Sequence, residues 1–215
     1  LFVEGDVRDF NTVKKISEGC DIIFHYAAMA SVNKSMQEPY NCNDINTGGT
    51  INILEAARIN NIKKIIFAST SAVYGDNPEL PKTENMQLSC LSPYAASKLS
   101  SEHYMKMYAE QYGIQTLVFR YFNIYGPKQD PSSPYSGVIS IFISKILSGE
   151  TPVIYGDGLQ SRDFVFINDV CEINYRAAIA EIPEKNIIAN VATGKSVNLI
   201  NLVETINKIN NTEFK

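Results

Sequence analysis

The sequence predicts an α/β protein with a doubly wound parallel sheet and a smaller α/β lobe. In residues 1–124, short apolar segments rich in β-branched residues alternate with helix-like segments. This alternation is typical of parallel strands that helices cover on both faces. After residue 126 the alternation loosens and prolines mark a loop. We therefore expect a first domain over residues 1–124, rejoined by residues 165–195, and a second lobe from residues 125–164 and 196–215.

The hydrophobic pattern places each element along the chain. The expected strands are residues 1–4, 21–26, 63–68, 115–121, 153–155, 164–167 and 187–191. The expected helices are residues 10–17, 44–60, 93–112, 139–147, 169–181 and 199–209. Asp9 is expected to cap the first helix, and Ser92 with Pro93 to begin the longest one, which Gly113 ends.

The composition excludes several classes of function. The net charge is −4 and no basic run is present, so we expect no nucleic-acid partner. No apolar run approaches the length of a membrane span, so we expect no membrane partner. The four cysteines and two histidines lack metal-ligand spacing, so we expect no metal site. Reduced thiols in a cytoplasmic protein are the simplest interpretation of these cysteines.

Tyr94 and Lys98 are the first candidates for chemistry. They stand four residues apart on a predicted helix and so share one face. A cation nearby favours the phenolate, and lowering the pKa of a tyrosine from about 10 to about 7 requires about 4 kcal/mol. Such a pair also occurs by chance on ordinary helices, but here a strand ending in the hydroxyls of residues 69–71 precedes it. Ligands of such sheets bind beyond the carboxyl ends of the strands, so we expect Thr70 to relay a substrate proton to Tyr94.

Several motifs in order along the chain carry a family resemblance. They are Phe67-Ala68-Ser69-Thr70-Ser71-Ala72-Val73-Tyr74-Gly75 and Ser92-Pro93-Tyr94-Ala95-Ala96-Ser97-Lys98, with further matches in residues 5–9, 25–28, 46–50, 120–127 and 156–164. With these motifs the chain resembles the extended short-chain dehydrogenase/reductase family, and within it the UDP-glucose and UDP-N-acetylglucosamine 4-epimerases. The resemblance covers nearly the whole chain and implies a Rossmann-like first domain, an NAD cofactor and a UDP-sugar substrate.

The resemblance also implies roles for individual residues. It implies three catalytic residues: Thr70, Tyr94 and Lys98. The cofactor-binding residues that it implies are Asp6, Val7, Ala27, Ala28, Asn46, Ser69, Tyr94, Lys98 and Tyr121. The substrate-binding residues that it implies are Ser31, Thr70, Ser71, Asn123, Val138, Tyr155 and Arg162, with the diphosphate held by Asn123 and Arg162.

For three of these residues the sequence also allows a purely structural role. Asp6, which would accept a hydrogen bond from adenine, could instead form a simple Asx-turn. Asn46 could make a local structural bond inside its helix. Arg162 could form a salt bridge with Asp163 or Asp169. These alternatives stay open at the level of the sequence.

The implied reaction is a 4-epimerisation through transient oxidation at C4 of the sugar. Related dehydratases and decarboxylases carry acidic residues just after the catalytic hydroxyl, where this chain has Ser71 and Ala72. A UDP-glucuronate 4-epimerase, another nucleotide-sugar dehydratase and a non-catalytic dinucleotide-binding regulator remain the alternatives. Ser31, Ser35 and Gln129 resemble positions of epimerases that accept N-acetylhexosamines, but they do not decide the sugar. Family members are usually dimers, so we expect a homodimer through helices 44–60 and 93–112.

One family feature is missing from the sequence. The family begins with a strand, a glycine-rich turn and a helix that binds the cofactor pyrophosphate, and no such turn occurs here. We therefore expect a longer protein whose first β-α-β segment precedes Leu1 and whose chain continues beyond Lys215. Residues 1–215 alone are expected to bind NAD weakly and to have little or no epimerase activity.

Overall fold

The computed structural model describes residues 1–133 and 136–214 and divides the chain into two compact units. The first unit consists of Leu1–Tyr121 and Ile173–Asn190. The second consists of Phe122–Glu172 and Val191–Lys215. Each unit is built from segments that are distant in the sequence, so the chain leaves the first unit and returns to it once.

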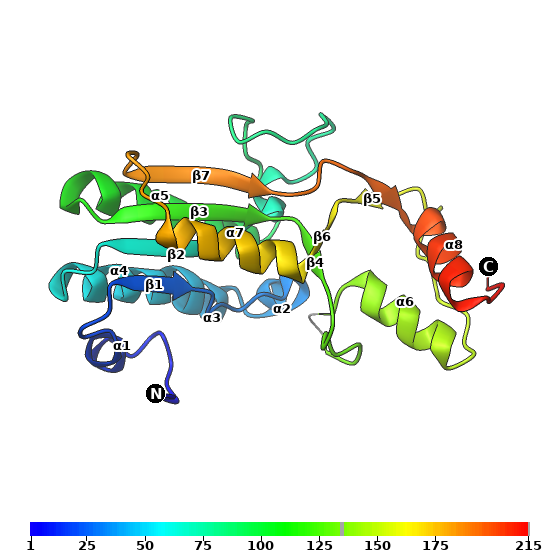
Figure 1. Cartoon of the computed structure of the whole chain (residues 1–215), viewed down its shortest axis with the longest axis horizontal. Coiled ribbons are helices and arrows are strands. Elements are labelled where there is room, and N and C mark those ends of the chain that lie inside the picture. The colour runs from blue at the N-terminus through cyan, green and yellow to red at the C-terminus, as the bar shows by residue number, and fades with distance from the viewer. Residues whose placement is uncertain (134–135, 215) are drawn as a thin grey trace. The chain divides into compact units, whose positions relative to one another are not determined.

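A four-stranded sheet forms the centre of the first unit (Figure 1). Its order is β1-β2-β3-β7, with β1 paired parallel to β2 and β2 parallel to β3. The strands are β1 (Ile22–His25), β2 (Lys64–Thr70), β3 (Gln115–Tyr121) and β7 (Asn186–Val191). The predicted α/β class with a parallel sheet is therefore confirmed.

Helices lie on both faces of this sheet. Figure 1 shows α7 (Ile167–Ile179) in front of the strands and α5 (Pro93–Tyr112) behind them. Helix α4 (Gly49–Ile59) lies beside α5, and α1 (Phe10–Ile16) packs against α4. Because both faces are covered, β3 is buried at six consecutive residues rather than at every second one.

The core between the sheet and the helices α4 and α5 is apolar. It contains Leu54 of α4, Phe67 of β2, Met105 of α5 and Val118 of β3, all with 0% exposure. Burying a side chain of this size contributes roughly 1.5–3 kcal/mol. The core therefore holds the strand ends and the long helix α5 together as one body.

Capping residues define the helix ends as predicted. The Asp9 carboxylate accepts hydrogen bonds from the backbone N–H groups of Asn11 and Thr12 at the start of α1. The Ser92 hydroxyl accepts from the N–H of Ala95, and Pro93 occupies the first turn of α5. Gly113 ends α5 with a φ of 70°, a left-handed conformation that glycine adopts at little cost.

The helix predicted over residues 44–60 is only the second part of a longer helical segment. It is preceded by α2 (Val32–Gln37) and α3 (Pro39–Asn43), which the sequence pattern did not reveal because both are short and largely polar. A π-helical turn, Asp44–Gly48, connects α3 directly to α4. A short 3₁₀ turn, Ser71–Tyr74, follows β2.

The second unit contains two small sheets and two helices. Strand β4 (Asn123–Tyr125) pairs parallel with β6 (Phe164–Phe166), and β5 (Ser161–Arg162) pairs antiparallel with β8 (Val197–Asn198). Helices α6 (Val138–Leu147) and α8 (Leu199–Asn210) pack on each other. Their shared apolar core comprises Phe142, Ile146, Leu199, Leu202, Val203 and Ile206.

Two predicted strands are wrong. Residues 1–4 and 153–155 have no strand conformation. A strand needs a neighbour to pair its backbone groups, and neither segment has one among the described residues. The exposure of the side chains agrees, at 88% for Phe2 and 83% for Tyr155. Apolar residues alone were therefore not sufficient to predict a strand in these two segments.

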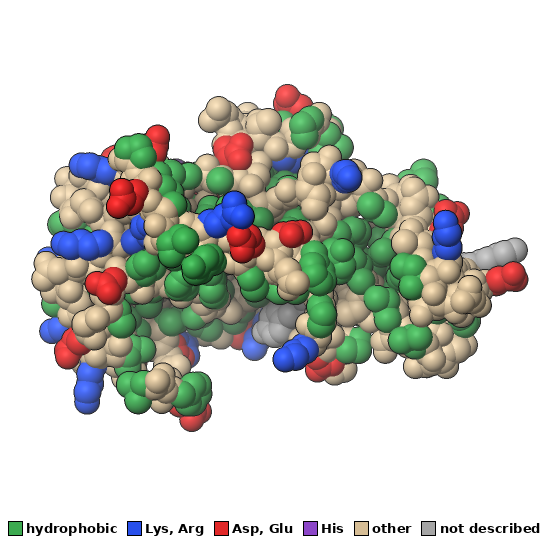
Figure 2. Space-filling model, in the orientation of Figure 1, with side chains coloured by type: hydrophobic (Ala, Val, Ile, Leu, Met, Phe, Trp, Pro, Cys, Tyr) green, Lys and Arg blue, Asp and Glu red, His purple; other side chains and the backbone are tan. Residues whose placement is uncertain are grey.

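The surface carries mixed charge on the face drawn in Figure 2, where basic and acidic side chains are interspersed. Within residues 1–133 and 136–214, no helix is both long and apolar enough to cross a bilayer. The same residues contain no group of three potential metal-ligating side chains. All four cysteines are free.

Candidate active site

The structure brings Thr70 and Tyr94 together at the carboxyl end of the parallel sheet. Thr70 is the last residue of β2, where its hydroxyl accepts a hydrogen bond of 3.1 Å from the N–H of Ala72. Tyr94 lies in the first turn of α5. The Thr70 side chain lies close enough to the Tyr94 phenol to lower its pKa. The strand end and the helix start therefore place a hydroxyl directly beside a phenol.

The groups of the chain nevertheless raise the pKa of Tyr94 above 10. Burial is the largest cause, because it disfavours the charged phenolate, and it outweighs the hydrogen bond from Thr70. Lys98 is not among the groups that shift the pKa of Tyr94. The chain's own groups thus do not lower this pKa, and the predicted lowering by two cations, Lys98 and a nicotinamide ring, stays a prediction.

Lys98 lies one helical turn after Tyr94 and is 3% exposed. Its ammonium donates a 2.8 Å hydrogen bond to the carbonyl oxygen of Ala68 and lies 4.7 Å from the ring centroid of Phe67. Burial lowers the pKa of Lys98 to about 8. Among the described residues Ala68 is the one hydrogen-bond partner of its ammonium, which has three N–H groups.

The Asn46 side chain connects two segments of the chain next to this site. It is 2% exposed and lies in the π-helical turn. Its side chain accepts from the N–H of Met29 at 2.8 Å and donates to the Met29 carbonyl oxygen at 3.2 Å. It also donates to the Ser97 hydroxyl at 2.9 Å. Asn46 thus joins the loop after β1, which contains Ala27 and Ala28, to the helix that carries Tyr94 and Lys98.

His25 is another buried titratable group near the site. Its Nε2 lies 3.0 Å from the Thr50 hydroxyl, and its ring stacks near Phe67. Burial, followed by the charge of Lys98, lowers the pKa of His25 to about 3. His25 is therefore neutral at physiological pH and serves in packing rather than in proton transfer.

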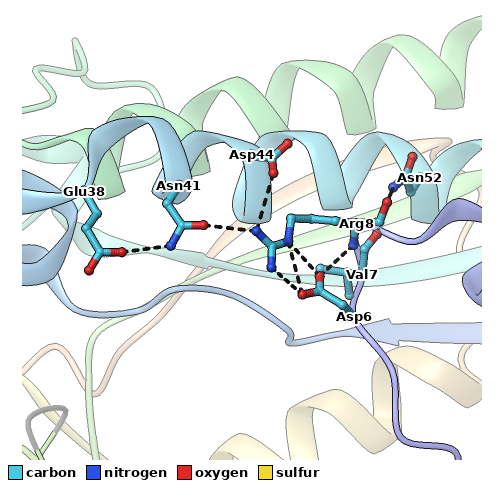
Figure 3. Close-up of polar contacts among 7 residues, drawn as sticks. All are labelled: Asp6, Val7, Arg8, Glu38, Asn41, Asp44 and Asn52. Carbon is cyan, nitrogen blue, oxygen red and sulfur yellow. Dashed lines mark hydrogen bonds and ion pairs between the residues drawn. The ribbon is translucent and has the colours of Figure 1, made fainter.

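Asp6 lies in an exposed loop and pairs with Arg8 (Figure 3). The guanidinium contacts both carboxylate oxygens, at 3.0, 3.1 and 2.6 Å, and holds the pKa of Asp6 at about 2. Arg8 also donates to Asn41 at 3.1 Å and lies 3.6 Å from the Asp44 carboxylate. The N–H of Arg8 bonds to Asp6 at 2.9 Å, as in the Asx-turn alternative.

Helix α4 holds the same loop from the other side (Figure 3). The Asn52 amide donates to the carbonyl oxygens of Val7 and Arg8, at 2.9 and 3.0 Å. A Cβ on Gly49 would come within 2.6 Å of the Val7 side chain, so only glycine allows this approach. The loop that contains Asp6 and Val7 is therefore well defined without any ligand contact.

The predicted serine positions make structural contacts. Ser31 caps α2 by accepting from the N–H of Lys34 at 3.1 Å. Ser35 is fully buried and accepts from the N–H of Tyr94 at 3.2 Å, which ties α2 to the start of α5. Ser71 is half-buried in the 3₁₀ turn after Thr70. Only Ser71 of these three directly adjoins the catalytic candidates in the sequence.

Two predicted cofactor residues use their hydroxyls inside the protein. Ser69 is 4% exposed and donates to the Glu102 carboxylate. Tyr121 is 8% exposed and donates to the side-chain oxygen of Asn174 at 2.8 Å. Sequence reasoning did not single out Glu102, although its position four residues after Lys98 places it on the same helix face.

The second unit contains a cavity of about 220 Å³ that brings together three of the predicted substrate residues, Asn123, Val138 and Arg162. Its lining includes Asn123, Gln129, Val138, Arg162 and Phe164. Tyr155 does not line it. Arg162 is exposed, and its only hydrogen bond among the described residues goes to the carbonyl oxygen of Ser161.

Asp163 orders the wall of this cavity and was missed at the sequence level. Its carboxylate accepts hydrogen bonds from the N–H groups of Thr193 and Gly194 and from the Thr193 hydroxyl, between 2.7 and 3.1 Å. Its carbonyl oxygen accepts from the Asn123 side chain at 3.1 Å. Within residues 1–133 and 136–214, Arg162 forms no salt bridge with Asp163 or Asp169, so that alternative is not realised.

Comparisons with known proteins identify the family of the chain. The model of the NAD dependent epimerase/dehydratase family matches residues 1–192. The chain belongs to this family. A UDP-N-acetylglucosamine 4-epimerase from Methanobrevibacter ruminantium, solved with UDP-N-acetylmuramic acid, is 43% identical with a TM-score of 0.93, over 99% of this chain and 67% of that one.

Two further solved structures are similar. A UDP-glucose 4-epimerase from Thermotoga maritima with UDP-glucose is 33% identical with a TM-score of 0.94, over 100% of this chain and 70% of that one. A UDP-glucose 4-epimerase from Thermus thermophilus in complex with NAD is 33% identical with a TM-score of 0.87, over 98% and 69% of the two chains. These neighbours have Rossmann-type folds, as the sequence predicted.

The chain spans part of the length of its curated relatives. It covers 66% of a relative from Methanocaldococcus jannaschii and 56% of a UDP-glucose 4-epimerase from Mycolicibacterium smegmatis. The relatives therefore contain segments with no counterpart in the 215 residues described by this sequence.

Proposed function

We propose that the complete protein is an NAD-dependent UDP-sugar 4-epimerase, an isomerase that acts by transient oxidation at C4. The observation that carries the proposal is the juxtaposition of Thr70 and Tyr94, with Lys98 one turn later, at the carboxyl end of a parallel sheet. This is the edge at which such sheets bind dinucleotides and substrates. Membership of the epimerase/dehydratase family supports the same reaction class.

The residues at this edge fit an NAD molecule. The Lys98 ammonium has three N–H groups, which suit the paired hydroxyls of a ribose. Ala27 and Ala28 follow β1 with short side chains, so a ligand can come close to the backbone there. Asp6 and Val7 lie in a loop that α4 holds in one conformation. When bound, NAD supplies reversible hydride acceptance at the sugar C4.

The chain's own residues handle the proton. Thr70 hydrogen-bonds the sugar 4-hydroxyl and Tyr94 accepts its proton, which Tyr94 returns when the C–H bond forms again on the other face of C4. The chain itself raises the pKa of Tyr94, so the phenolate needs positive charge close by. Lys98 and a cationic nicotinamide ring are the charges that this mechanism invokes.

We assign the UDP moiety to the cavity of the second unit. Arg162 is exposed, without a salt bridge among the described residues, and its planar guanidinium suits phosphate oxygens. Asn123 lines the same cavity and belongs to β4, which pairs with the strand that follows Arg162. Val138 contributes apolar surface there.

The identity of the sugar is the finer part of the proposal. We favour UDP-glucose or UDP-N-acetylglucosamine, the sugars in the names of the similar epimerases. Ser71 and Ala72 follow Thr70 and neither can act as an acid, which favours epimerisation over dehydration. UDP-glucuronate remains the third substrate to test.

The test is a product analysis of the complete protein. It is incubated with NAD and separately with UDP-glucose, UDP-N-acetylglucosamine and UDP-glucuronate, and proton NMR reads the configuration at C4 of each product. A C4 epimer from one of these sugars is the expected result and names the substrate. A 4-keto-6-deoxy sugar would contradict the proposed reaction, and no turnover of any of them would favour a non-catalytic dinucleotide-binding protein.

We also propose that the protein forms a homodimer through α4 and α5. Both helices expose apolar side chains, among them Ile59 at 39%, Met107 at 41% and Tyr112 at 53%. Sedimentation equilibrium of the complete protein tests this, and a Met107→Glu variant that sediments like wild type would place any interface elsewhere.

A further inference from the structure

A buried group of charged residues lies next to the catalytic candidates and has no role in the mechanism above. Glu102 of α5 is 2% exposed and Arg120 of β3 is 3% exposed. Ser69 of β2 completes the group at 4% exposure. Charged side chains are almost never buried so deeply unless they are paired, so the burial of Glu102 and Arg120 needs an explanation.

The three side chains form one connected network. Arg120 donates two parallel hydrogen bonds to the Glu102 carboxylate, with Nε–Oε1 at 3.0 Å and Nη2–Oε2 at 2.7 Å. The Ser69 hydroxyl donates to the same Oε1 atom. Arg120 also donates to the Tyr74 hydroxyl at 3.0 Å, and its guanidinium lies 5.1 Å from that ring.

The network cross-links strand β2 to helix α5 immediately behind the catalytic residues. Ser69 precedes Thr70 in β2, and Glu102 lies one helical turn after Lys98 in α5. A second link runs beside it, from the Lys98 ammonium to the carbonyl oxygen of Ala68. Two successive residues of the strand are thereby bound to two successive turns of the helix.

Packing alone does not account for an ion pair at this position. Removing two charges from water is costly, and well-packed apolar side chains of similar volume often stabilise a core as well or better. An ion pair adds a fixed orientation of its two side chains, because the planar guanidinium donates two parallel hydrogen bonds to the carboxylate. The network therefore restricts how β2 and α5 can shift against each other.

We propose that Ser69, Glu102 and Arg120 are positioning residues that set the distance between the Thr70 hydroxyl and the Tyr94 phenol. None of them touches the reacting atoms. Ser69 connects the pair to the strand, Glu102 connects it to the helix, and Arg120 holds the carboxylate in the orientation that both links require. The inference rests on the proposed epimerase function for its kinetic consequence, but not for its structural one.

Ser69→Ala is the sharpest test, because it removes the link to the strand and leaves the buried ion pair whole. Glu102→Gln would leave Arg120 as an unpaired buried charge and fold poorly. The control is Thr116→Val, which removes another buried hydroxyl between β3 and α5. Thr116 is fully buried and donates to the Met105 carbonyl oxygen at 3.4 Å, at the opposite end of β3 from Tyr121. Ser69→Thr keeps the hydroxyl and serves as the conservative variant.

The complete protein loaded with NAD gives the kinetic result. We expect kcat of Ser69→Ala to fall about 10-fold to 100-fold, as for a displaced catalytic pair, while KM changes less than about twofold. Ser69→Thr should recover most of kcat, and Thr116→Val should lower thermal stability with kcat unchanged. If Ser69→Ala loses only stability, as Thr116→Val does, the network is structural and the proposal is overturned.

Amide hydrogen exchange of the same variants decides the matter without turnover. The N–H groups of Thr70 and Tyr94 should exchange faster in Ser69→Ala than in Thr116→Val, after correction for global stability. If the wild type turns over no UDP-sugar, the proposed function fails and this exchange result still tests the positioning role. Equal exchange in the two variants would overturn it.

Discussion

The two candidate sites differ in how their polar groups are held. In the first unit, Lys98 and Asn46 are hydrogen-bonded to other groups of the same unit and are buried, at 3% and 2% exposure. In the second unit, Arg162 is exposed and bonded only to its neighbour's carbonyl oxygen among the described residues. Proton transfer requires fixed distances, whereas a phosphate can be captured by a solvated guanidinium that reorients as it binds. The polar groups of the first site are thus held more rigidly than Arg162 of the second.

Removing the phenol of Tyr94 should have the largest effect. In Tyr94→Phe the site loses its general base, and kcat is expected to fall roughly 10²-fold to 10⁴-fold. Binding of NAD and UDP-sugar should stay within about threefold of wild type, because the ring remains in its place beside Thr70. Initial rates by NMR and isothermal titration give the two numbers, and a turnover equal to wild type would remove Tyr94 from the mechanism.

Lys98→Met should separate stability from activity. A pKa lowered from 10.5 to about 8 by burial corresponds to an unfavourable free energy of about 3 kcal/mol for holding the charged form. The variant should abolish epimerisation and yet resist denaturant better than wild type at pH 7, less the value of the lost bond to Ala68.

The pH dependence supplies the sign of this effect. The pKa of Lys98 is lower in the folded than in the unfolded protein. The stability that the neutral amine allows is therefore complete above pH 10.5 and is lost as the pH falls through about 8. The unfolding free energy of wild type should therefore rise relative to that of Lys98→Met as the pH increases from 7 to 10.5. Urea titrations at both pH values measure the difference, and a constant difference would show that Lys98 is not destabilised by burial.

Arg162→Met should weaken substrate binding and spare the fold. Losing a charge-assisted hydrogen bond costs about 1.5–3 kcal/mol, so KM for the UDP-sugar should rise roughly 10-fold to 150-fold. Since Arg162 is exposed, thermal stability should not change. Free UDP should lose affinity by the same factor, and unchanged UDP binding would assign the diphosphate to other residues.

Arg8→Met should have the smallest effect. The pair with Asp6 is exposed to solvent, so the stability of the protein should hardly change. We expect NAD to bind only a few-fold more weakly, because Asn52 and Gly49 still hold the loop when Arg8 no longer orients the Asp6 carboxylate. Asn52→Ala is the matched variant, which removes the other clamp on the loop, and titration with NAD compares the two.

The sequence predicted correctly the elements that depend on residues close together in the chain. The cap at Ser92, the proline after it and the glycine that ends α5 each act within one helical turn, and all three are as predicted. The apolar strands β1, β2 and β3 were identified because a sheet covered on both faces requires continuous apolar runs. The same rule misled at residues 1–4 and 153–155, which are apolar but have no strand beside them.

The sequence predicted that Tyr94 and Lys98 lie together but did not predict the buried residues that support them. Tyr94 and Lys98 share a helix face at a fixed spacing, so one stretch of sequence places them. Glu102 and Arg120 meet only because β3 lies beside β2 under α5, a contact between residues 18 apart in the chain. The chain also could not reveal that burial raises the pKa of Tyr94, because burial is a property of the packed structure.

The π-helical turn at Asp44–Gly48 accommodates one residue more than a regular α-helical turn would. If the same residues wound as a regular α-helix, everything after the turn would rotate by about 100° relative to what precedes it. Gly49 and Asn52 would then turn away from the loop at Val7 and Arg8 while Asn46 stayed with Met29. Asn46 and the residues that hold the Val7–Arg8 loop thus face their partners at the same time only because the helix is π-wound between them.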